Sequence, residues 1–289
     1  MTPASHDTNS IRYRPGTMGG MTVAHLRITD FRFERHSHAE YAVGFTRRGV
    51  QTFNCRGTRQ QSTPGHVILM NPDVMHDGLP GDGAGYEYGM LYVEEGALHE
   101  LLERSAGTAA GAHFRDVIVH DPAAAGALRS ALAAAGGPQE TLRGDVLAVQ
   151  ALVGLVLRHG EQPNAGGTPV RSGEHRMRRV REYIEAHAAR DLSLADLAAE
   201  AGVSRVYLSR AFARHVGVPP HIYLNAVRLR RARASLLRGH TLADTAAATG
   251  FSDQSHFTRR FKGAMGLTPG EWLRQVRPAS PSLDTGASS

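Results

Sequence analysis

Two strips of polar and basic side chains lie at helical spacing in the C-terminal part of the sequence. Each strip follows the i, i+3, i+4, i+7 pattern that places four side chains on one face of a helix. The strips comprise Val206, Ser209, Arg210 and Ala213, and Ser255, Thr258, Arg259 and Lys262. Arg210 and Arg259 occupy equivalent mid-helix positions, from which an arginine can reach a guanine edge in a major groove. The strips therefore predict two DNA-reading faces.

Further side chains near the ends of the same helices are expected to contact double-stranded DNA. They are Arg205, Arg214, Gln254, His256 and Arg260. Arg205, Gln254 and His256 can read bases or hold phosphates. Arg214 and Arg260 are predicted to hold phosphates, and such contacts position a protein without reading the sequence. Val206 is apolar, so base discrimination by the first strip is expected to be modest and to rely on thymine methyl groups.

A repeated segment positions these strips. Residues 193–204 recur as residues 241–252 with seven of twelve positions identical, and the similarity resumes after one inserted residue. Each copy has an aspartate in the first turn of a helix, a glycine where that helix ends and a serine that can cap the next helix. They are Asp196, Gly202 and Ser204 in the first copy, and Asp244, Gly250 and Ser252 in the second. The pattern predicts two helix-turn-helix units rather than a helical bundle with solvated arginines.

The charge distribution agrees with an anionic partner for this part of the chain. Residues 174–277 contain 18 Lys or Arg against 9 Asp or Glu, whereas the whole chain of 289 residues has a net charge of only +6. A basic C-terminal module therefore follows a mildly acidic N-terminal one. The single cysteine, Cys55, excludes an internal disulfide and a cysteine-based metal site. The sequence shows no signal peptide and no membrane span, so a cytoplasmic protein is expected.

The N-terminal half has a different pattern. Short runs with strand character, separated by turn signals, extend from about Thr22 to Val93 and predict a small barrel or sandwich. Residues 94–159 are predicted to be mainly helical. One apolar stripe there is a candidate for packing on the barrel or on a second subunit, and it contains Val146, Val149, Leu152, Val153 and Val156.

Residues 175–274 resemble the AraC/XylS family of transcription regulators. The resemblance is carried by the string Gly250-Phe-Ser-Asp-Gln-Ser-His-Phe-Thr-Arg-Arg-Phe-Lys262 and by Gly266-Leu-Thr-Pro269. It implies two helix-turn-helix units joined by a long helix, here from Pro219 to about Leu237, that holds both reading helices for successive major grooves about 34 Å apart. Residues 33–41 and 65–78 are similar to the two halves of the family's cupin-like barrel. The resemblance implies a small-molecule effector in the barrel, a homodimer formed through an adjacent helix, and RNA polymerase as a partner.

Four residues are candidates for the effector pocket: His36, His38, Glu40 and His76. The first three alternate, so on a strand they share one face, and such a set can also form a transition-metal site. The spacing departs from the metal-cupin pattern, however, because Glu40 is too close to the histidine pair and no asparagine follows His76 at the expected distance. Effector-pocket lining or structural histidines are therefore favoured, with no metal and no cofactor expected.

The resulting prediction is an α+β chain of two domains, with a cupin-like β-barrel and flanking helices followed by an all-α domain. The expected parts are a flexible arm (1–20), an effector and dimerisation domain (21–159), a linker (160–173), a DNA-binding domain (174–277) and a tail (278–289). The helix-turn-helix units are placed at about 194–215 and 242–264. The function predicted is that of a non-enzymatic, sequence-specific transcription regulator such as an activator. The alternatives are a metal-dependent cupin enzyme with an appended DNA-binding module and a sequence-independent DNA binder.

Overall fold

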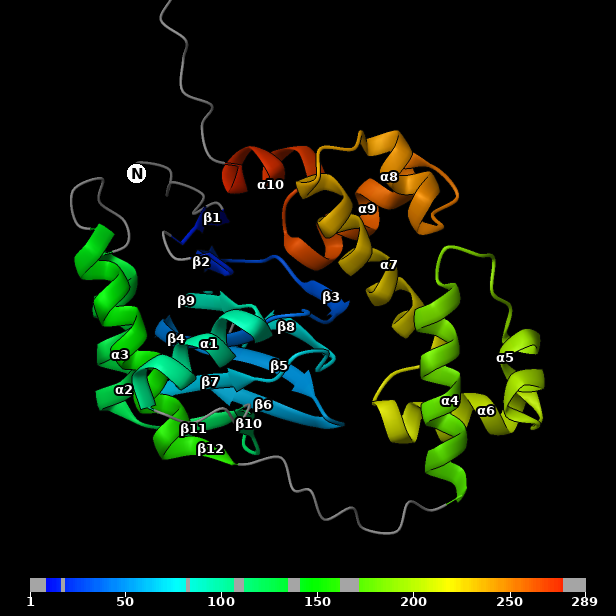
Figure 1. The fold of residues 1–289 in the computed structure, drawn as a ribbon, viewed down its shortest axis with the longest axis horizontal. Helices are drawn as coiled ribbons and strands as arrows, with labels where there is room; N and C mark the ends of the chain where they lie inside the picture. Colours follow the sequence, from blue (N-terminus) through cyan, green and yellow to red (C-terminus); the bar gives the residue numbers. More distant parts are fainter. Residues whose placement is uncertain are drawn as a thin grey trace, which may run out of the picture.

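In the part of the chain that the structure describes, two larger β-sheets, one short two-stranded sheet and three helices form the N-terminal half, and seven further helices form the C-terminal half (Figure 1). The computed structural model describes residues 9–16, 19–81, 84–106, 112–134, 141–161 and 172–277. The predicted tail, and most of the predicted linker, lie outside these described residues. The two-domain α+β class predicted from the sequence is confirmed.

The larger sheet has six strands in the order β1-β2-β9-β4-β7-β11. Their bounds are Ser10–Pro15 (β1), Met21–Ile28 (β2), Tyr86–Val93 (β9), Tyr41–Gly49 (β4), His66–Met70 (β7) and Ile118–His120 (β11). A second sheet has the order β3-β8-β5-β6, with Phe33–His36 (β3), His76–Pro80 (β8), Gln51–Cys55 (β5) and Thr58–Ser62 (β6). The pair β10 and β12 is short, at His113–Phe114 and Gly160–Glu161.

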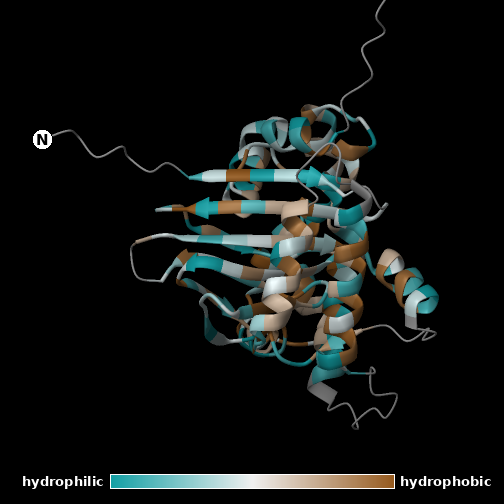
Figure 2. Cartoon of the chain, turned by 90° about the vertical axis from the view of Figure 1, so that its left-hand side faces the viewer, coloured by the Kyte–Doolittle hydropathy of each residue, from teal (hydrophilic) through white to brown (hydrophobic). Residues whose placement is uncertain are grey.

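Alternation of apolar side chains gives the larger sheet two buried faces. Val43 and Leu91 pack into one cluster together with helices α1 (Glu95–Ala106), α2 (Pro122–Ala134) and α3 (Thr141–His159). Their neighbours Ala42 and Met90 belong to another cluster on the opposite face. Successive residues of a strand point to opposite faces, so both faces need a cover. Hydrophobic and hydrophilic segments accordingly succeed one another along the strands (Figure 2).

Two predictions for this half need correction. The described strands form a six-stranded, a four-stranded and a two-stranded sheet rather than a closed barrel. Residues 10–15, predicted as part of a loose arm, form edge strand β1, which pairs with β2 along its full length. The reason is an alternation hidden in a polar segment, because Ile11 and Tyr13 are buried whereas Arg12 and Arg14 are exposed.

The C-terminal half follows the predicted repeat. The first unit comprises α4 (Ser172–His187), α5 (Leu194–Ala201) and α6 (Arg205–Val216), and the second comprises α8 (Leu242–Thr249), α9 (Gln254–Met265) and α10 (Pro269–Val276). The long helix α7 (Pro220–Leu237) joins them, as predicted. Its first half packs in the core of the first unit and its second half in that of the second unit.

The helix ends confirm most of the predicted signals. Gly202 and Gly250 adopt the left-handed conformation at the ends of α5 and α8, and the Ser204 side chain accepts a hydrogen bond from the Tyr207 amide at the start of α6. The prediction for Ser252 was wrong. Asp253 caps α9 instead, since its carboxylate accepts the His256 amide at 2.7 Å. The second copy has one extra residue after Ser252, and this moves the cap of α9 by one position.

The second unit shares a continuous hydrophobic core with the N-terminal domain. Ile11, Tyr13 and Phe33 of the sheets lie in one cluster with Met265 and Trp272 of the second unit. The contact is also polar, because the Tyr13 amide donates to the Gln275 side chain at 2.7 Å. Among the described residues, no helix is long and apolar enough to cross a membrane.

Candidate functional site

The two reading strips lie on α6 and α9, and packing fixes which face of each helix points outward. Leu208 and Phe212 of α6, and Phe257 and Phe261 of α9, are fully buried. Since these residues recur four positions apart, they hold one face of each helix against its core. The opposite face carries Arg210 and Arg259, both of which are exposed.

The other residues predicted to contact DNA fall into two groups. Those exposed at the surface are Arg205, Val206, Arg214, Gln254, Ser255 and Lys262. Those half-buried are Ser209, His256, Thr258 and Arg260. Burial and the neighbouring Arg260 and Arg259 lower the pKa of His256, which favours its neutral form. A neutral imidazole can accept as well as donate a hydrogen bond at a base edge.

Arg260 differs from the other predicted phosphate contacts because the N-terminal domain already holds it. Its Nη1 atom lies 3.1 Å from the carboxylate of Glu34 in β3. Glu34 also lies against Gly263, three residues further along α9, because a Cβ atom built there would be only 2.6 Å from the Glu34 carboxyl carbon. One side of α9 is thus docked on the N-terminal domain, while its reading strip stays on the outer surface.

Helix α7 adds ion pairs that the sequence analysis did not identify. Arg233 donates to both carboxylate oxygens of Glu40, at 2.7 and 3.2 Å, and its side chain is only 13% exposed. Arg230 pairs with Asp73 and, at 2.6 Å, with Glu185 of α4. A visible signal was the density of arginines in an otherwise apolar helix, since charged side chains on such a helix need partners.

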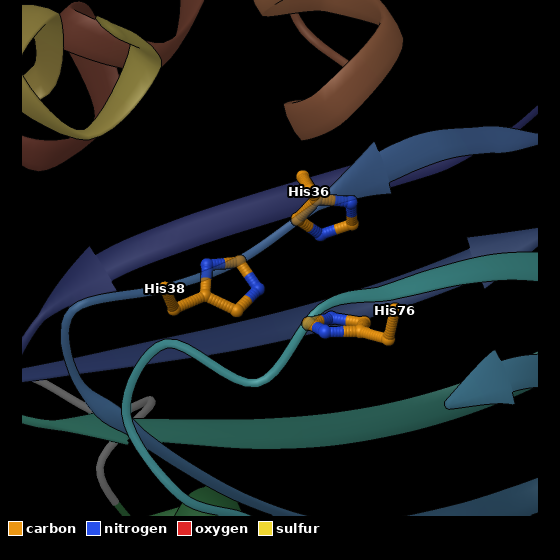
Figure 3. Close-up of side chains that lie close together, drawn as sticks. All are labelled: His36, His38 and His76. Atoms are coloured by element: carbon orange, nitrogen blue, oxygen red, sulfur yellow. The ribbon is translucent and has the colours of Figure 1, made fainter. Parts of the chain in front are cut away.

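Three histidines cluster where β3 and β8 meet. Ring centroids are 4.4 Å apart for His36 and His76, 4.8 Å for His36 and His38, and 5.1 Å for His38 and His76. One nitrogen of each ring can be chosen so that all three lie within 4.8 Å of one another. Figure 3 shows the three side chains close together, two from the segment at the end of β3 and one from β8.

All three rings are buried, and burial is the main reason why their pKa values fall. The pKa of His36 is about 3, with the neighbouring His76 as a further cause, and the pKa of His38 is well below its ordinary value. The pKa of His76 is lowered as well. The imidazoles are therefore neutral at pH 7, which is the form that binds metal ions.

The cluster lines a cavity of about 30 Å³ inside the N-terminal domain. The wall also includes Tyr13, Gln51 and Tyr92, and it is completed by Ala264 of helix α9. Three of the four predicted pocket residues thus line one cavity. Glu40 is not among its lining residues, because Arg233 holds its carboxylate away at the domain contact.

Two other features noted in the sequence have clear positions. Cys55 is buried in β5, and burial raises the pKa of its thiol to about 11, so it is an unreactive strand residue. On α3, Leu152 is buried, whereas Val146 and Leu157 are 47% and 67% exposed. Val146 and Leu157, together with the half-buried Val149 and Val153, line an open apolar groove.

Comparison with known proteins identifies both halves of the chain. Residues 19–157 match the AraC-like ligand binding domain, and residues 197–275 match a helix-turn-helix domain. An uncharacterized HTH-type transcriptional regulator of Bacillus subtilis, YbfI, is 28% identical over 80% of this chain and 86% of its own length. A second uncharacterized HTH-type regulator, SACOL0084 of Staphylococcus aureus, is 36% identical over 37% of this chain, but only 14% of that protein is covered.

Among solved structures, ToxT of Vibrio cholerae has a similar fold across both domains. Its crystal structure with a bound unsaturated fatty acid aligns with a TM-score of 0.56 and 13% identity, covering 89% of this chain and 96% of ToxT. The apo structure of a ToxT variant aligns with a TM-score of 0.55 and 13% identity, and covers 91% of this chain and all of that one. At this level of identity, the similarity establishes the fold alone.

Proposed function

Because this chain belongs to the AraC family of DNA-binding transcription regulators, we propose that it reads DNA through α6 and α9 and that its N-terminal domain controls α9. The chain combines a ligand-binding domain with a helix-turn-helix domain in one polypeptide. The two reading helices would enter successive major grooves, about 34 Å apart, on one face of the duplex.

The observation that supports control of α9 is the wall of the histidine cavity. Ala264, which lies on the docked side of α9, closes a cavity whose other lining residues come from the N-terminal domain. A ligand that changes the shape of this cavity would therefore directly change how the reading helix α9 packs against the N-terminal domain. Arg260 is the second link, because its ion pair with Glu34 competes with a phosphate for the same guanidinium.

The DNA-reading assignment is tested by two matched arginine substitutions. Arg259→Ala is expected to weaken binding to the specific site by about 1–3 kcal/mol, roughly five- to 160-fold, and to relax the preference at one base pair. Arg210→Ala is expected to have a smaller effect, since its strip also presents Val206. Binding is measured by fluorescence anisotropy on sites selected from a random DNA library.

Arg274→Ala serves as the control, because Arg274 is an exposed arginine of α10 outside both strips. It removes the same charge and should leave the base preference unchanged. Equal loss for Arg259→Ala and Arg274→Ala, without a change of preference, would contradict base reading by α9. Loss of all preference in the wild-type protein would favour the sequence-independent binder instead.

The remaining assignments follow from this role. We propose that the chain acts in the cytoplasm, that it recruits or contacts RNA polymerase at promoters, and that it is not an enzyme. The effector would be a small ligand bound in the N-terminal domain. ToxT, with the same fold, has been crystallised with an unsaturated fatty acid, whereas the cavity here is polar at one end because of its three histidines.

The groove on α3 supports a homodimer as the working form. Its apolar residues recur at positions 146, 149, 153 and 157, which form a continuous stripe on one helix face. Leu157→Glu is expected to shift the chain from dimer to monomer in analytical ultracentrifugation. Leu237→Glu is the control, since Leu237 is an exposed leucine at the end of α7. A monomeric wild type would refute the proposal.

A further inference from the structure

The three clustered histidines have the donor set of a transition-metal centre. We propose that His36, His38 and His76 bind one divalent first-row transition-metal ion such as Zn²⁺ inside the N-terminal domain. Imidazole nitrogens suit Zn, Cu, Fe and Ni, and three of them with one open position form a common zinc arrangement. In a tetrahedral site with Zn–N distances near 2 Å, ligand nitrogens lie about 3.4 Å apart. The nitrogens here lie within 4.8 Å, so small ring movements are sufficient.

Backbone carbonyls orient two of the rings for this purpose. The Nδ1 atom of His36 lies 2.7 Å from the Glu34 carbonyl oxygen, and that of His76 lies 2.9 Å from the Val74 carbonyl oxygen. A carbonyl can only accept a hydrogen bond, so each Nδ1 carries the proton and donates it. Each Nε2 is then left with a free lone pair for a metal. Metal-binding histidines are typically fixed by such hydrogen bonds from the second ring nitrogen.

The third ring offers an unpaired nitrogen. His38 is 6% exposed, and among the described residues its Nδ1 atom has no hydrogen-bond partner. A buried polar atom without a partner is costly, and it calls for an absent ligand or water. The Gln51 side-chain oxygen, on the wall of the same cavity, is also buried without a partner in the described part of the chain. It can accept a hydrogen bond from a water molecule in the fourth metal position.

The size of the cavity favours an ion over an organic molecule. Its volume is about 30 Å³, and a cavity needs roughly 10–15 Å³ to hold one water molecule. Pockets for organic ligands of ordinary size are about 300–1,000 Å³. An ion together with one bound water therefore fits the cavity, whereas a sugar or a fatty acid requires a larger one.

The same segment connects the histidines with the DNA-binding domain. Glu34, whose carbonyl holds His36, uses its side chain to hold Arg260 of α9. Glu40, two residues after His38, holds Arg233 of α7. Turning the rings of His36 and His38 toward an ion acts on the short segment that lies between these two acidic residues. We therefore expect metal binding to change DNA affinity, an expectation that rests on the proposed function, whereas the metal site itself does not.

The site is tested on the full chain, freed of metal with a chelator and then titrated with Co²⁺ and Zn²⁺. Co²⁺ bound by three imidazoles and water gives visible absorption bands of a four-coordinate ion. We expect one ion per chain and an increase of Tm with Zn²⁺. His38→Ala and His76→Ala should each weaken Zn²⁺ binding at least about tenfold, the loss seen even when only an outer partner of a ligand is removed.

His120→Ala is the matched control. His120 belongs to a histidine pair with His66 at the edge of the same domain, 5.3 Å between ring centroids, and its removal should leave the stoichiometry at one. A substoichiometric wild type, or unchanged Zn²⁺ affinity in both His38→Ala and His76→Ala, overturns the site. If a variant loses its fold in circular dichroism, His38→Gln takes its place, because glutamine keeps a polar group in the cavity.

The link to DNA is measured separately. Anisotropy titrations with and without Zn²⁺ should differ for the wild type and agree for His76→Ala, and DNA must change Zn²⁺ affinity by the same factor. Stoichiometric Zn²⁺ binding with identical DNA curves would refute the link while leaving the site intact. A protein that binds Zn²⁺ but no DNA at all would refute the proposed function instead.

Discussion

The two helix-turn-helix units have the same local design but different surroundings. Each has a capped first helix, a left-handed glycine and a second helix held by two buried residues four positions apart. Around Gly202 of the first unit there is open space, since a Cβ atom there would meet no other described atom within 4 Å. At Gly250 of the second unit, a Cβ atom would lie 2.7 Å from the Ala188 carbonyl oxygen.

The contrast shows where control can act. A repeated motif specifies its own turn, but it does not specify what packs against it. The second unit touches the end of α4 through Gly250 and the N-terminal domain through α9 and α10. The first unit has fewer such contacts, among them a hydrogen bond of 2.9 Å from Arg35 to the Gly217 carbonyl. Regulation by the N-terminal domain is therefore expected to reach the second unit first.

The largest difference is expected when alanine replaces the two glycines. Gly202→Ala adds only the strain of a left-handed alanine, about 1–2 kcal/mol. Gly250→Ala adds, to the same strain, a collision with two backbone carbonyls that cannot rotate away, so we expect a loss of about 3 kcal/mol or more. Urea unfolding followed by circular dichroism measures both. Equal losses would mean that α8 can move away from α4 freely.

The next contrast concerns the acidic partners of α7. Burial would raise the pKa of Glu40, but the adjacent Arg233 holds it below its ordinary value. Burial raises the pKa of Asp73 in spite of Arg230, which has Glu185 as a second partner. Glu40→Gln leaves a buried arginine with no other ion-pair partner among the described residues and is expected to lower the free energy of unfolding by about 2 kcal/mol. Asp73→Asn should cost less than about 1 kcal/mol.

The pH dependence distinguishes a charge effect from a packing effect. Since folding lowers the pKa of Glu40, its contribution is complete above the unfolded value of about 4.3 and is lost as the pH falls through the folded value. The difference between wild type and Glu40→Gln should therefore shrink below about pH 4. A difference that stays constant between pH 7 and pH 3 would show that shape rather than charge is responsible. In the comparison variant Asp73→Asn, the substitution itself adds no backbone strain, because asparagine tolerates the left-handed φ of 62° at position 73.

The sequence predicted the parts of this comparison that depend on neighbours in the chain. Gly202, Gly250 and Ser204 each act within a few residues, so their types and spacing were sufficient. Asp253 was missed because one inserted residue moves the cap, and β1 was missed because its alternation of buried and exposed residues lies in a polar segment.

Contacts between distant segments could not be predicted in this way. Glu34 and Arg260 are 226 positions apart, and Glu40 and Arg233 are 193 apart. Each of these residues has an ordinary surface pattern in its own segment, and only the docking of the two domains brings the charges together. The histidines were recognised as a group, but Glu40 was placed with them because strand alternation does not show that an arginine from α7 holds it.

Glu34→Gln is expected to have the smallest effect on stability and the most informative effect on DNA binding. Glu34 and Arg260 are 48% and 37% exposed, so Glu34→Gln should change the free energy of unfolding by less than about 1 kcal/mol. It frees Arg260 to meet a phosphate, which should strengthen DNA binding about two- to fivefold and steepen the slope of log K against log salt by about one. Anisotropy titrations between 50 and 200 mM salt, on the order of the usual working range, with a chelator present, measure both.

The control for this prediction is Glu87→Gln. Glu87 is a carboxylate of the same domain, on β9, and it pairs with Arg27 and Arg47 rather than with the second unit. Both variants raise the net charge by one, so a general electrostatic attraction would strengthen DNA binding equally in the two. Only the release of Arg260 predicts that Glu34→Gln steepens the salt slope and that Glu87→Gln does not. Adding Arg260→Ala to the Glu34→Gln variant should then remove the steeper slope. If the slopes of Glu34→Gln and Glu87→Gln agree, Arg260 is a domain contact and not a phosphate contact.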